Sequence, residues 1–300
     1  MLEFFEEFPE MSRGDLRDFK KAIDSAFRSF SRTNGEAIES FFDPILWFLI
    51  WLEKLLLATP WPIIILVVAG LCYLGARSWK LSLGSILIFV LIGYLGMWED
   101  TMSTIALISV ATLLCISIGI PLGIWMARSD RVQWLVTPVL DVMQTIPIFV
   151  YLLPVLMLLG IGKVPGLIAV CVYAMPPIVR LTNLGIRLVD KDILEAADAF
   201  GADKKQRLFG VQIPLALPNI FAGINQTIMM ALAMVVIASM IGTRGLGDEV
   251  LLGLQQLNVG SALEAGLAIV LLAIVFDRIT QAYGEKIQER TQPTKKKKVI

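Results

Sequence analysis

Long apolar runs, separated by short polar stretches, dominate the chain from residue 60 onward. A helix of about 20 apolar residues is long enough to cross the hydrocarbon core of a bilayer. Runs near this length predict seven spanning helices, over residues 60–76, 81–98, 101–127, 137–159, 164–186, 213–241 and 261–283. The pattern therefore predicts an all-α polytopic membrane protein with a transmembrane domain over residues 60–284.

The first 58 residues follow a different pattern. Residues 1–40 are polar and predict a polar N-terminal tail, whereas residues 41–58 are apolar but short and are interrupted by Glu53 and Lys54. This composition favours an amphipathic helix that lies on the membrane surface. A membrane crossing by residues 41–58 is the alternative, and it would raise the number of spans to eight.

The distribution of lysine and arginine predicts the orientation of the chain. Basic residues gather in residues 77–80, 128–136 and 187–212 and in the tail over 285–300, while the alternate loops hold few of them. Short loops that are rich in lysine and arginine face the cytoplasm. The C-terminal tail is therefore expected in the cytoplasm, and seven spans place the N-terminal tail on the extracytoplasmic side.

Composition adds to this picture mainly by exclusion. The chain is 56% hydrophobic and 17% charged, as is typical of a membrane protein, and its net charge of zero does not favour a nucleic-acid partner. It has no histidine, and its three cysteines lie far apart in apolar runs, which argues against histidine-based catalysis, a disulfide framework and a metal site. A phosphate-binding loop of the GxxxxGK type followed by Ser or Thr is absent. We therefore expect neither an enzyme nor a chain that binds ATP or another cofactor itself.

One charged stretch, EAADAFGADKKQRLFGVQIPLALP over residues 195–218, separates two apolar runs. Asp192 with Glu195 three residues later predicts a capping box at the start of a short amphipathic helix. Gly201 suits a helix C-cap with a positive φ, and Asp203 predicts the start of a second short helix. An ordinary amphipathic loop accounts for this pattern equally well. The length of residues 187–212, compared with the other cytoplasmic loops, favours a docking helix for a soluble partner.

The same stretch carries a resemblance to a known family. Glu195-Ala196-Ala197, then Gly201, then Val211-x-Ile213-Pro214 resembles the EAA motif of permease subunits in binding-protein-dependent ABC importers, with Val for Ile at 211 and Ile for Leu at 213. Over about residues 60–284, stretches such as GIPLGIWMARSDR (119–131), YAMPPIVRLTNLGI (173–186) and NQTIMMALAMVVIASMIG (225–242) look similar to permeases of glycine betaine, proline betaine and choline importers.

This resemblance implies a type I ABC importer permease fold. It implies that a coupling helix contacts the ATPase through Glu195, Ala196, Ala197, Gly201 and Pro214. It also implies a homodimer of this chain in the bacterial inner membrane, two ATP-binding-cassette subunits that hold ATP and magnesium, and an extracytoplasmic solute-binding protein. The resemblance leaves open which amine is carried, because glycine betaine, choline, carnitine and trimethylamine N-oxide all suit the family.

Polar residues and prolines within the predicted spans are candidates for the translocation path. Such groups are costly in lipid and usually face the bundle interior or a pathway. We select Asp141, Gln144, Pro147, Phe149, Tyr151, Asn225 and Gln226. For each of them, a helix kink or a hydrogen bond between helices is the alternative role. A carrier driven by an ion gradient is the alternative function, for which Asp141 and Arg180 are the candidate ionisable groups. Gly119 and Gly123 form a GxxxG pattern that predicts a close helix contact.

Overall fold

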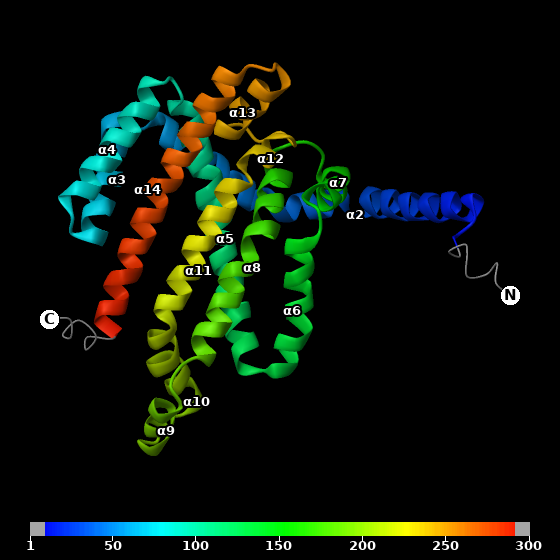
Figure 1. The fold of residues 1–300 in the computed structure, drawn as a ribbon. Coiled ribbons are helices and arrows are strands. Elements are labelled where there is room, and N and C mark those ends of the chain that lie inside the picture. Colours follow the sequence, from blue (N-terminus) through cyan, green and yellow to red (C-terminus); the bar gives the residue numbers. More distant parts are fainter. Residues whose placement is uncertain (1–9, 292–300) are drawn as a thin grey trace, which may run out of the picture.

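The structure is a computed structural model that describes residues 10–291, all of whose regular elements are helices (Figure 1). Their order along the chain is α2 (Arg13–Ala58), α3 (Trp61–Ala76), α4 (Trp79–Tyr94), α5 (Trp98–Arg128), α6 (Asp130–Thr145), α7 (Ile148–Leu159), α8 (Lys163–Arg187), α9 (Lys191–Ala199), α10 (Lys204–Gln206), the π-helix η1 (Arg207–Gln212), α11 (Ile213–Ala233), α12 (Val235–Ser239), α13 (Leu246–Gln255) and α14 (Val259–Thr291).

The core forms where α8 packs between α5 and α11 (Figure 1). Small residues allow this close packing. A Cβ atom added to Gly119 would lie 2.5 Å from Cγ2 of Ile178, and one added to Gly123 would lie 2.7 Å from the carbonyl oxygen of Val179. On the opposite side of α8, a Cβ atom added to Gly185 would lie 2.7 Å from Cβ of Asn219. The close helix contact that the GxxxG pattern predicted is confirmed.

Three predicted spans match single long helices. The runs over 101–127, 164–186 and 261–283 correspond to α5, α8 and α14, each of which extends by one or more residues beyond the predicted bounds. The run over 213–241 corresponds to α11 and α12, with a break in the helix at Met234. Apolar periodicity and length therefore predicted the central helices well, because these runs are long and uninterrupted by charge.

Over residues 10–291, the structure has fewer helices of membrane-spanning length than the seven spans predicted from the sequence. Four helical segments could each cross a membrane alone, and up to six crossings result if each of two bent helix pairs counts as one. The predicted spans 60–76 and 81–98 correspond to α3 and α4, which have 16 residues each. Sixteen residues give about 24 Å of helix, whereas the hydrocarbon core is about 30 Å thick. The prediction of about seven spans is thus higher than these lengths support.

The predicted span over residues 137–159 is wrong as a single helix. The chain breaks at Ile146 and Pro147, and α6 and α7 meet there at 96°. Ile146 has an extended backbone, with ψ of 129°. The residue before a proline is driven out of the α region by a clash with the proline ring, so the break lies where this rule places it. The pair forms a broken span or a re-entrant segment.

The N-terminal helix α2 is longer than the predicted helix over 41–58. It begins at Arg13 and runs without a break past Pro44 to Ala58, where the chain turns by 108° into α3. Its N-terminal part projects beyond the other helices (Figure 1). The rest of the helix packs on α5 and α7, with Ser31 and Gly35 beside the end of α7. The hydroxyl of Ser31 donates to the carbonyl of Met157 at 2.8 Å, which provides a partner for a free carbonyl at the end of α7. The surface location of residues 41–58 stays a prediction.

Candidate functional site

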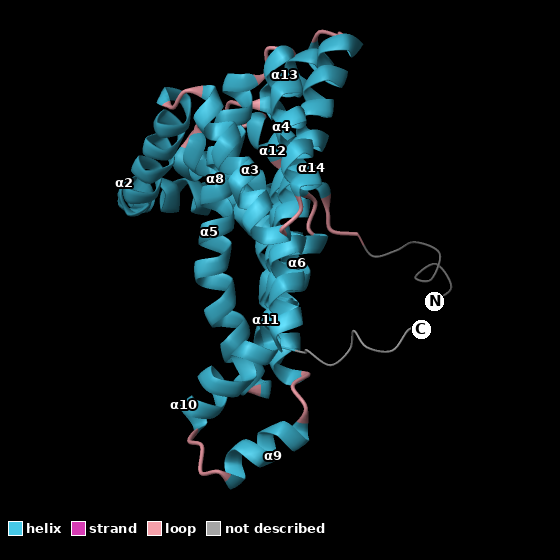
Figure 2. Ribbon diagram, turned by 90° about the vertical axis from the view of Figure 1, so that its left-hand side faces the viewer, coloured by secondary structure: helices cyan, strands magenta, loops and turns pink. Residues whose placement is uncertain are grey.

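The candidate docking site is the segment between α8 and α11. It contains α9, α10 and η1, and Figure 2 shows it at one tip of the molecule, beyond the helix bundle. None of the residues of α9 is buried. The shape of α9 therefore depends on its caps and on one ion pair rather than on packing in the core.

The start of α9 differs from the predicted capping box at Asp192 and Glu195. Asp190 is the N-cap, and its carboxylate accepts a hydrogen bond from the backbone N–H of Asp192 at 3.0 Å. The predicted box at Asp192 is therefore wrong. Asp190 has the non-helical backbone of an N-cap residue. Asp192 lies in the first turn, where its negative charge interacts favourably with the positive end of the helix dipole.

The end of α9 is the glycine cap that the sequence predicted. Gly201 has φ of +81°, in the left-handed region that glycine adopts without a Cβ penalty. The N–H of Ala202 donates to the carbonyl of Ala197 at 3.1 Å, and the N–H of Gly201 donates to the carbonyl of Asp198 at 3.0 Å. This pair of bonds is a Schellman motif. It turns the chain sharply after Phe200.

The helix start predicted at Asp203 is confirmed, but the helix is not a short separate one, because α10 continues through η1 into α11 without a break. The carboxylate of Asp203 accepts from the N–H of Lys205 and of Gln206, both at 2.7 Å, and the side chain of Gln206 accepts from the N–H of Asp203 at 2.9 Å. Arg207 then pairs with Asp198 at 2.8 Å and so links η1 to α9. The ion pair holds α9 beside the first turns of that continuous helix.

The π-helix η1 connects this segment to α11 just before Pro214. A proline within a helix lacks an N–H and crowds the carbonyl four residues earlier. The chain widens here into i−5 bonding, with the N–H of Ile213 donating to the carbonyl of Leu208. Such single π turns occur frequently at functional sites. Pro214 thus lies at the junction of the surface segment and a long apolar helix.

Three large apolar side chains of this segment are exposed among its charged residues. Phe200 is 94% exposed, Phe209 is 66% exposed and Ile193 is 42% exposed. Glu195 and Ala196 are exposed beside them, and Ala197 is half-buried. Large apolar side chains exposed on one short segment make it a candidate surface for protein or membrane contact. We call the segment over residues 190–209 the docking tip.

The predicted path residues of α6 lie next to α8 and α11. Asp141 forms an ion pair with Arg180 of α8 at 2.5 Å, and both side chains are half-exposed. Gln144 approaches the sulfur of Met230 on α11 at 3.9 Å. The two ionisable groups that a gradient-driven carrier would use are therefore paired with each other.

The path candidates of α11 have other neighbours. The amide of Asn225 donates to Asp277 of α14 at 2.9 Å and accepts from the hydroxyl of Thr280. Gln226 is exposed and lines a cavity of about 520 Å³ between α11 and α14. The structure does not bring Asn225 and Gln226 together with Asp141, so a single chain does not unite the predicted path.

The remaining candidates lie at and after the break between α6 and α7. Pro147 is the N-cap of α7 and is exposed, and Phe149 is 58% exposed. Tyr151 is half-buried beside Leu152 and Ile241, and its hydroxyl is buried without a hydrogen-bond partner. A buried hydroxyl without a partner is rare, and it marks this part of α7 as a place where a polar ligand or water is favourable.

One ion pair between α2 and α8 was not predicted from the sequence. Glu53 of α2 forms an ion pair with Lys163 at the start of α8, and only 13% of the Glu53 side chain is exposed. Close by, Gly242 packs so tightly on the loop before α8 that an added Cβ would lie 2.6 Å from Cγ2 of Ile161. The available signal was that Glu53 and Lys163 each interrupt an apolar stretch and carry opposite charges.

The loop after Gly242 leads into α13, which carries a carboxylate with a perturbed pKa. Burial raises the pKa of Glu249 above its ordinary value of 4.5, and the nearby carboxylates of Asp100 and Asp248 raise it further. Among the described residues, no group of histidine, cysteine and carboxylate side chains is arranged to hold a metal ion.

A bundle of apolar helices, several of them long enough to cross a membrane, with an exposed segment at one tip defines a polytopic membrane protein. The chain belongs to the family described as binding-protein-dependent transport system inner membrane component, whose model matches residues 119–289. It is therefore a multi-pass membrane permease and not an enzyme, and ATP hydrolysis belongs to a separate subunit of the importer.

Two relatives and one solved structure illustrate the relationship. The chain is 48% identical over 252 residues to the glycine betaine/proline betaine transport system permease protein ProW of Escherichia coli K12, which covers 82% of this chain and 70% of ProW. It is 49% identical over 221 residues to the glycine betaine transport system permease protein OpuAB of Bacillus subtilis 168, covering 72% and 78%. A chain of the inward-facing MetNI methionine ABC transporter shares the fold, with a TM-score of 0.56 at 20% identity over 61% of this chain and 92% of that chain.

Proposed function

We propose that this chain forms the translocation pathway of an ATP-driven importer for glycine betaine and related quaternary amines. Support comes from the names of its relatives, which include transporters of glycine betaine and proline betaine at 48% identity and of glycine betaine and carnitine at 47% identity. More distant relatives are named for choline and for trimethylamine N-oxide. The shared chemistry of these solutes is a small amine that carries several methyl groups.

The observation that carries the proposal is the exposed apolar surface of the docking tip. Phe200 at 94% exposure is costly in water, because a buried aromatic side chain contributes about 1.5–3 kcal/mol relative to an exposed one. Its rigid caps keep this surface ready for a partner. In this proposal the ATP-binding-cassette subunit covers Glu195, Ala196, Ala197 and Phe200.

Coupling follows from how the docking tip is attached. Its first helix follows α8 directly, and the Asp198–Arg207 ion pair links it to η1, which continues into α11 through Pro214. A push on the docking tip therefore reaches the two helices that pack most extensively on each other. ATP binding would draw the docking tips of two copies together and open the pathway outward. Hydrolysis would then reset the inward-open state.

Two copies of the chain complete the pathway in this proposal. The path candidates Asp141, Gln144, Pro147, Phe149, Tyr151, Asn225 and Gln226 lie on two surfaces of one chain, and a second copy would supply the missing wall. The positive-inside pattern supports a location in a bacterial inner membrane with the docking tip and the C-terminus on the cytoplasmic side. A solute-binding protein then delivers the amine from the other side.

The test is uptake of radiolabelled solute in a strain without compatible-solute transport, expressing this chain with its ATPase and binding protein. We expect uptake of glycine betaine that unlabelled proline betaine or choline reduces. We also expect uptake to continue when an ionophore collapses the ion gradients while cellular ATP is maintained. Uptake that stops with the gradients at constant ATP would overturn the proposal in favour of a gradient-driven carrier.

A further inference from the structure

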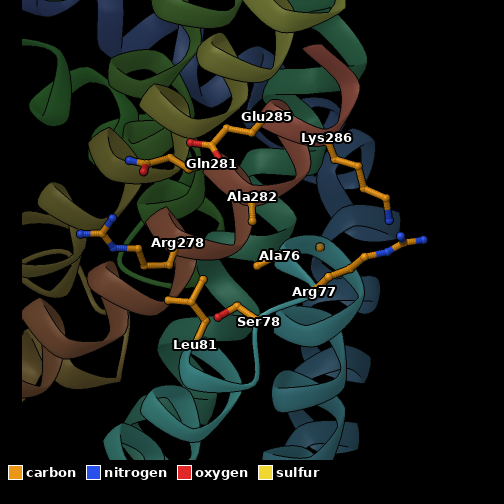
Figure 3. A pocket seen from close by; sticks show the side chains of 10 residues that line it. Ala76, Arg77, Ser78, Leu81, Arg278, Gln281, Ala282, Glu285 and Lys286 are labelled. Carbon is orange, nitrogen blue, oxygen red and sulfur yellow. The ribbon is translucent and has the colours of Figure 1, made fainter. Parts of the chain in front are cut away.

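A cavity of about 590 Å³ lies between the α3–α4 turn and the C-terminal part of α14, far from the docking tip in sequence. Arg77, Arg278 and Lys286 line it, and Glu285 is the one carboxylate among its lining residues. Three positive charges and one negative charge leave a net charge of +2. Figure 3 shows Arg77 and Lys286 extending on one side of the cavity and Arg278 on the other.

The cations of this cavity have no anionic partner in the described chain. The four ion pairs among the described side chains, which end at Gln288, involve other residues, so no described carboxylate lies within 4.0 Å of the charged groups of Arg77, Arg278 or Lys286. The ammonium of Lys286 donates to the carbonyl of Leu74 at 2.9 Å, which fixes its position beside the end of α3. Like charges that line one cavity repel each other, and a bound anion would relieve that repulsion.

The backbone of Arg77 is held in an unfavourable conformation. It caps α3 with φ of 47° and ψ of 29°, in the left-handed region that glycine normally occupies at such a position. An L-residue with a Cβ atom costs about 1–2 kcal/mol there. Strain of this kind at an exposed arginine points to a role for its side chain.

The surroundings identify the source of the anion. Trp79 is 66% exposed directly after Ser78, which lines the cavity, and Leu74 is 61% exposed directly before Gly75, which also lines it. A soluble anion gains nothing from these apolar neighbours, whereas a lipid places its phosphate in the cavity and its acyl chains beside them. Basic pockets between transmembrane helices are known to suit anionic lipid head groups.

We propose that this cavity is a binding site for the head group of an anionic phospholipid, with its phosphodiester held by Arg77 and Lys286, which extend on the same side, while Arg278 on the other side adds to the positive charge of the cavity. The bound lipid would connect the α3–α4 hairpin to α14, on which that hairpin mainly packs. The proposal is independent of the solute that the chain transports. A positive-inside signal alone is the competing explanation, and it assigns no special role to the cavity.

The test uses the full chain with the subunits that co-purify, in nanodiscs of phosphatidylglycerol and phosphatidylethanolamine, and measures retained lipid by native mass spectrometry. The variant is Arg77→Gln/Arg278→Gln/Lys286→Gln. The matched control is Lys80→Gln/Arg128→Gln/Arg131→Gln, which removes three exposed cations of the same predicted face outside the cavity. We expect selective retention of phosphatidylglycerol by the wild type and the control, and affinity weakened on the order of a hundredfold in the cavity variant. Equal retention by both variants, or no retention by the wild type, would overturn the proposal.

Two single variants separate binding from folding. Arg77→Gly removes one cation and relieves the strained φ, so the chain should keep or gain thermal stability in detergent while it loses phosphatidylglycerol roughly tenfold. Glu285→Gln removes the opposing charge and should strengthen retention. Normal retention in Arg77→Gly overturns the role of this arginine. Glycerol phosphate in detergent is the last arm: if it stabilises the chain as much as the lipid does, the lipid assignment is wrong.

Discussion

The middle of α8 and the docking tip are neighbours in sequence but are built on opposite rules. Ile178 and Val179 are fully buried against α5 and α11, whereas Phe200, some twenty residues later, is 94% exposed. The core finishes its packing within one chain. The docking tip is held by its helix caps and leaves large apolar side chains exposed. The comparison shows that the helix bundle buries its own core, whereas the docking tip leaves apolar side chains exposed that only a partner could cover.

Glycine shows the same contrast in a single residue type. Gly123 in the core is required because any Cβ atom would meet α8, at 2.7 Å from the carbonyl of Val179. Gly201 in the docking tip has open space around it, with no atom within 4 Å of an added Cβ, but its φ is +81°. The first position is limited by contact and the second by backbone conformation. Substitutions at the two sites should therefore fail in different ways.

The largest effect is expected for Gly123→Val. The added side chain forces α5 and α8 apart, and overpacking of this kind costs about 3 kcal/mol. We expect the thermal unfolding midpoint in detergent to fall by roughly 6–12 °C, with loss of the monodisperse species on size exclusion. Gly70→Val is the control, because an added Cβ there meets nothing within 4 Å. Equal unfolding midpoints for the two variants would show that the close contact of Gly123 with α8 does not limit stability.

Gly201→Val should leave the fold intact and abolish transport. A β-branched residue at this φ costs about 1–2 kcal/mol, which breaks the Schellman cap and moves Phe200 while the bundle is untouched. Expression and the unfolding midpoint should match the wild type, and solute uptake should fall to background. Gly201→Asn is the control, because asparagine tolerates this conformation, and its uptake should be largely retained. Normal uptake by Gly201→Val would exclude the cap from the coupling mechanism.

A smaller effect, confined to association, is expected for Glu195→Lys. The side chain is exposed on α9, so reversing its charge should change stability by less than about 0.5 kcal/mol. Co-purification of the ATPase should fall about tenfold, and uptake should fall with it. Asp24→Lys makes the same charge change at an exposed position of α2. If both variants retain the ATPase and transport equally, Glu195 does not contact it.

The smallest expected effect is a pH dependence of stability caused by Glu249 of α13, which belongs neither to the core around α8 nor to the docking tip. Because burial and neighbouring carboxylates raise the pKa of Glu249, the folded chain binds more protons than the unfolded chain between the ordinary and the raised value. Stability therefore falls as pH rises through that window. Glu249→Gln should raise the unfolding midpoint at neutral pH by less than about 2 °C and leave it unchanged below the ordinary value. A midpoint that shifts equally at both pH values would show that ionisation of Glu249 is not the cause.

Much of the bundle could be predicted from the sequence because long apolar runs leave few alternatives. The helices α5, α8 and α14 lie where their runs placed them. The break at Pro147 was missed because hydropathy continues through it, although the proline rule applies to Ile146. The extension of α2 back to Arg13 was missed because its residues are polar, and polarity alone predicts no end of a helix. The number of spans stays a prediction at α3 and α4, whose 16 residues each are shorter than a full crossing by length alone.

The docking tip was predicted more closely than the path. Glycine at 201 and aspartate at 203 are typical of a helix C-cap and a helix N-cap, so the C-terminal cap of α9 and the N-cap of α10 were predicted correctly. Asp190 and Asp192 are chemically equivalent caps, and only the three-dimensional course of the chain selects Asp190. The path depends on which polar groups remain unpaired after folding. Asn225 bonds Asp277 and Thr280 across more than fifty residues, a pairing that no local pattern contains.

The central claim is that the docking tip contacts an ATP-hydrolysing subunit. The direct measurement replaces Phe200 with a photo-crosslinking phenylalanine analogue, irradiates native membranes and identifies the crosslinked partner by mass spectrometry. The same analogue at Phe30 of α2, which is 49% exposed, is the control. We predict a product with a P-loop ATPase at position 200 and none at position 30. Only lipid adducts at position 200, in membranes that still transport the solute, would contradict the account.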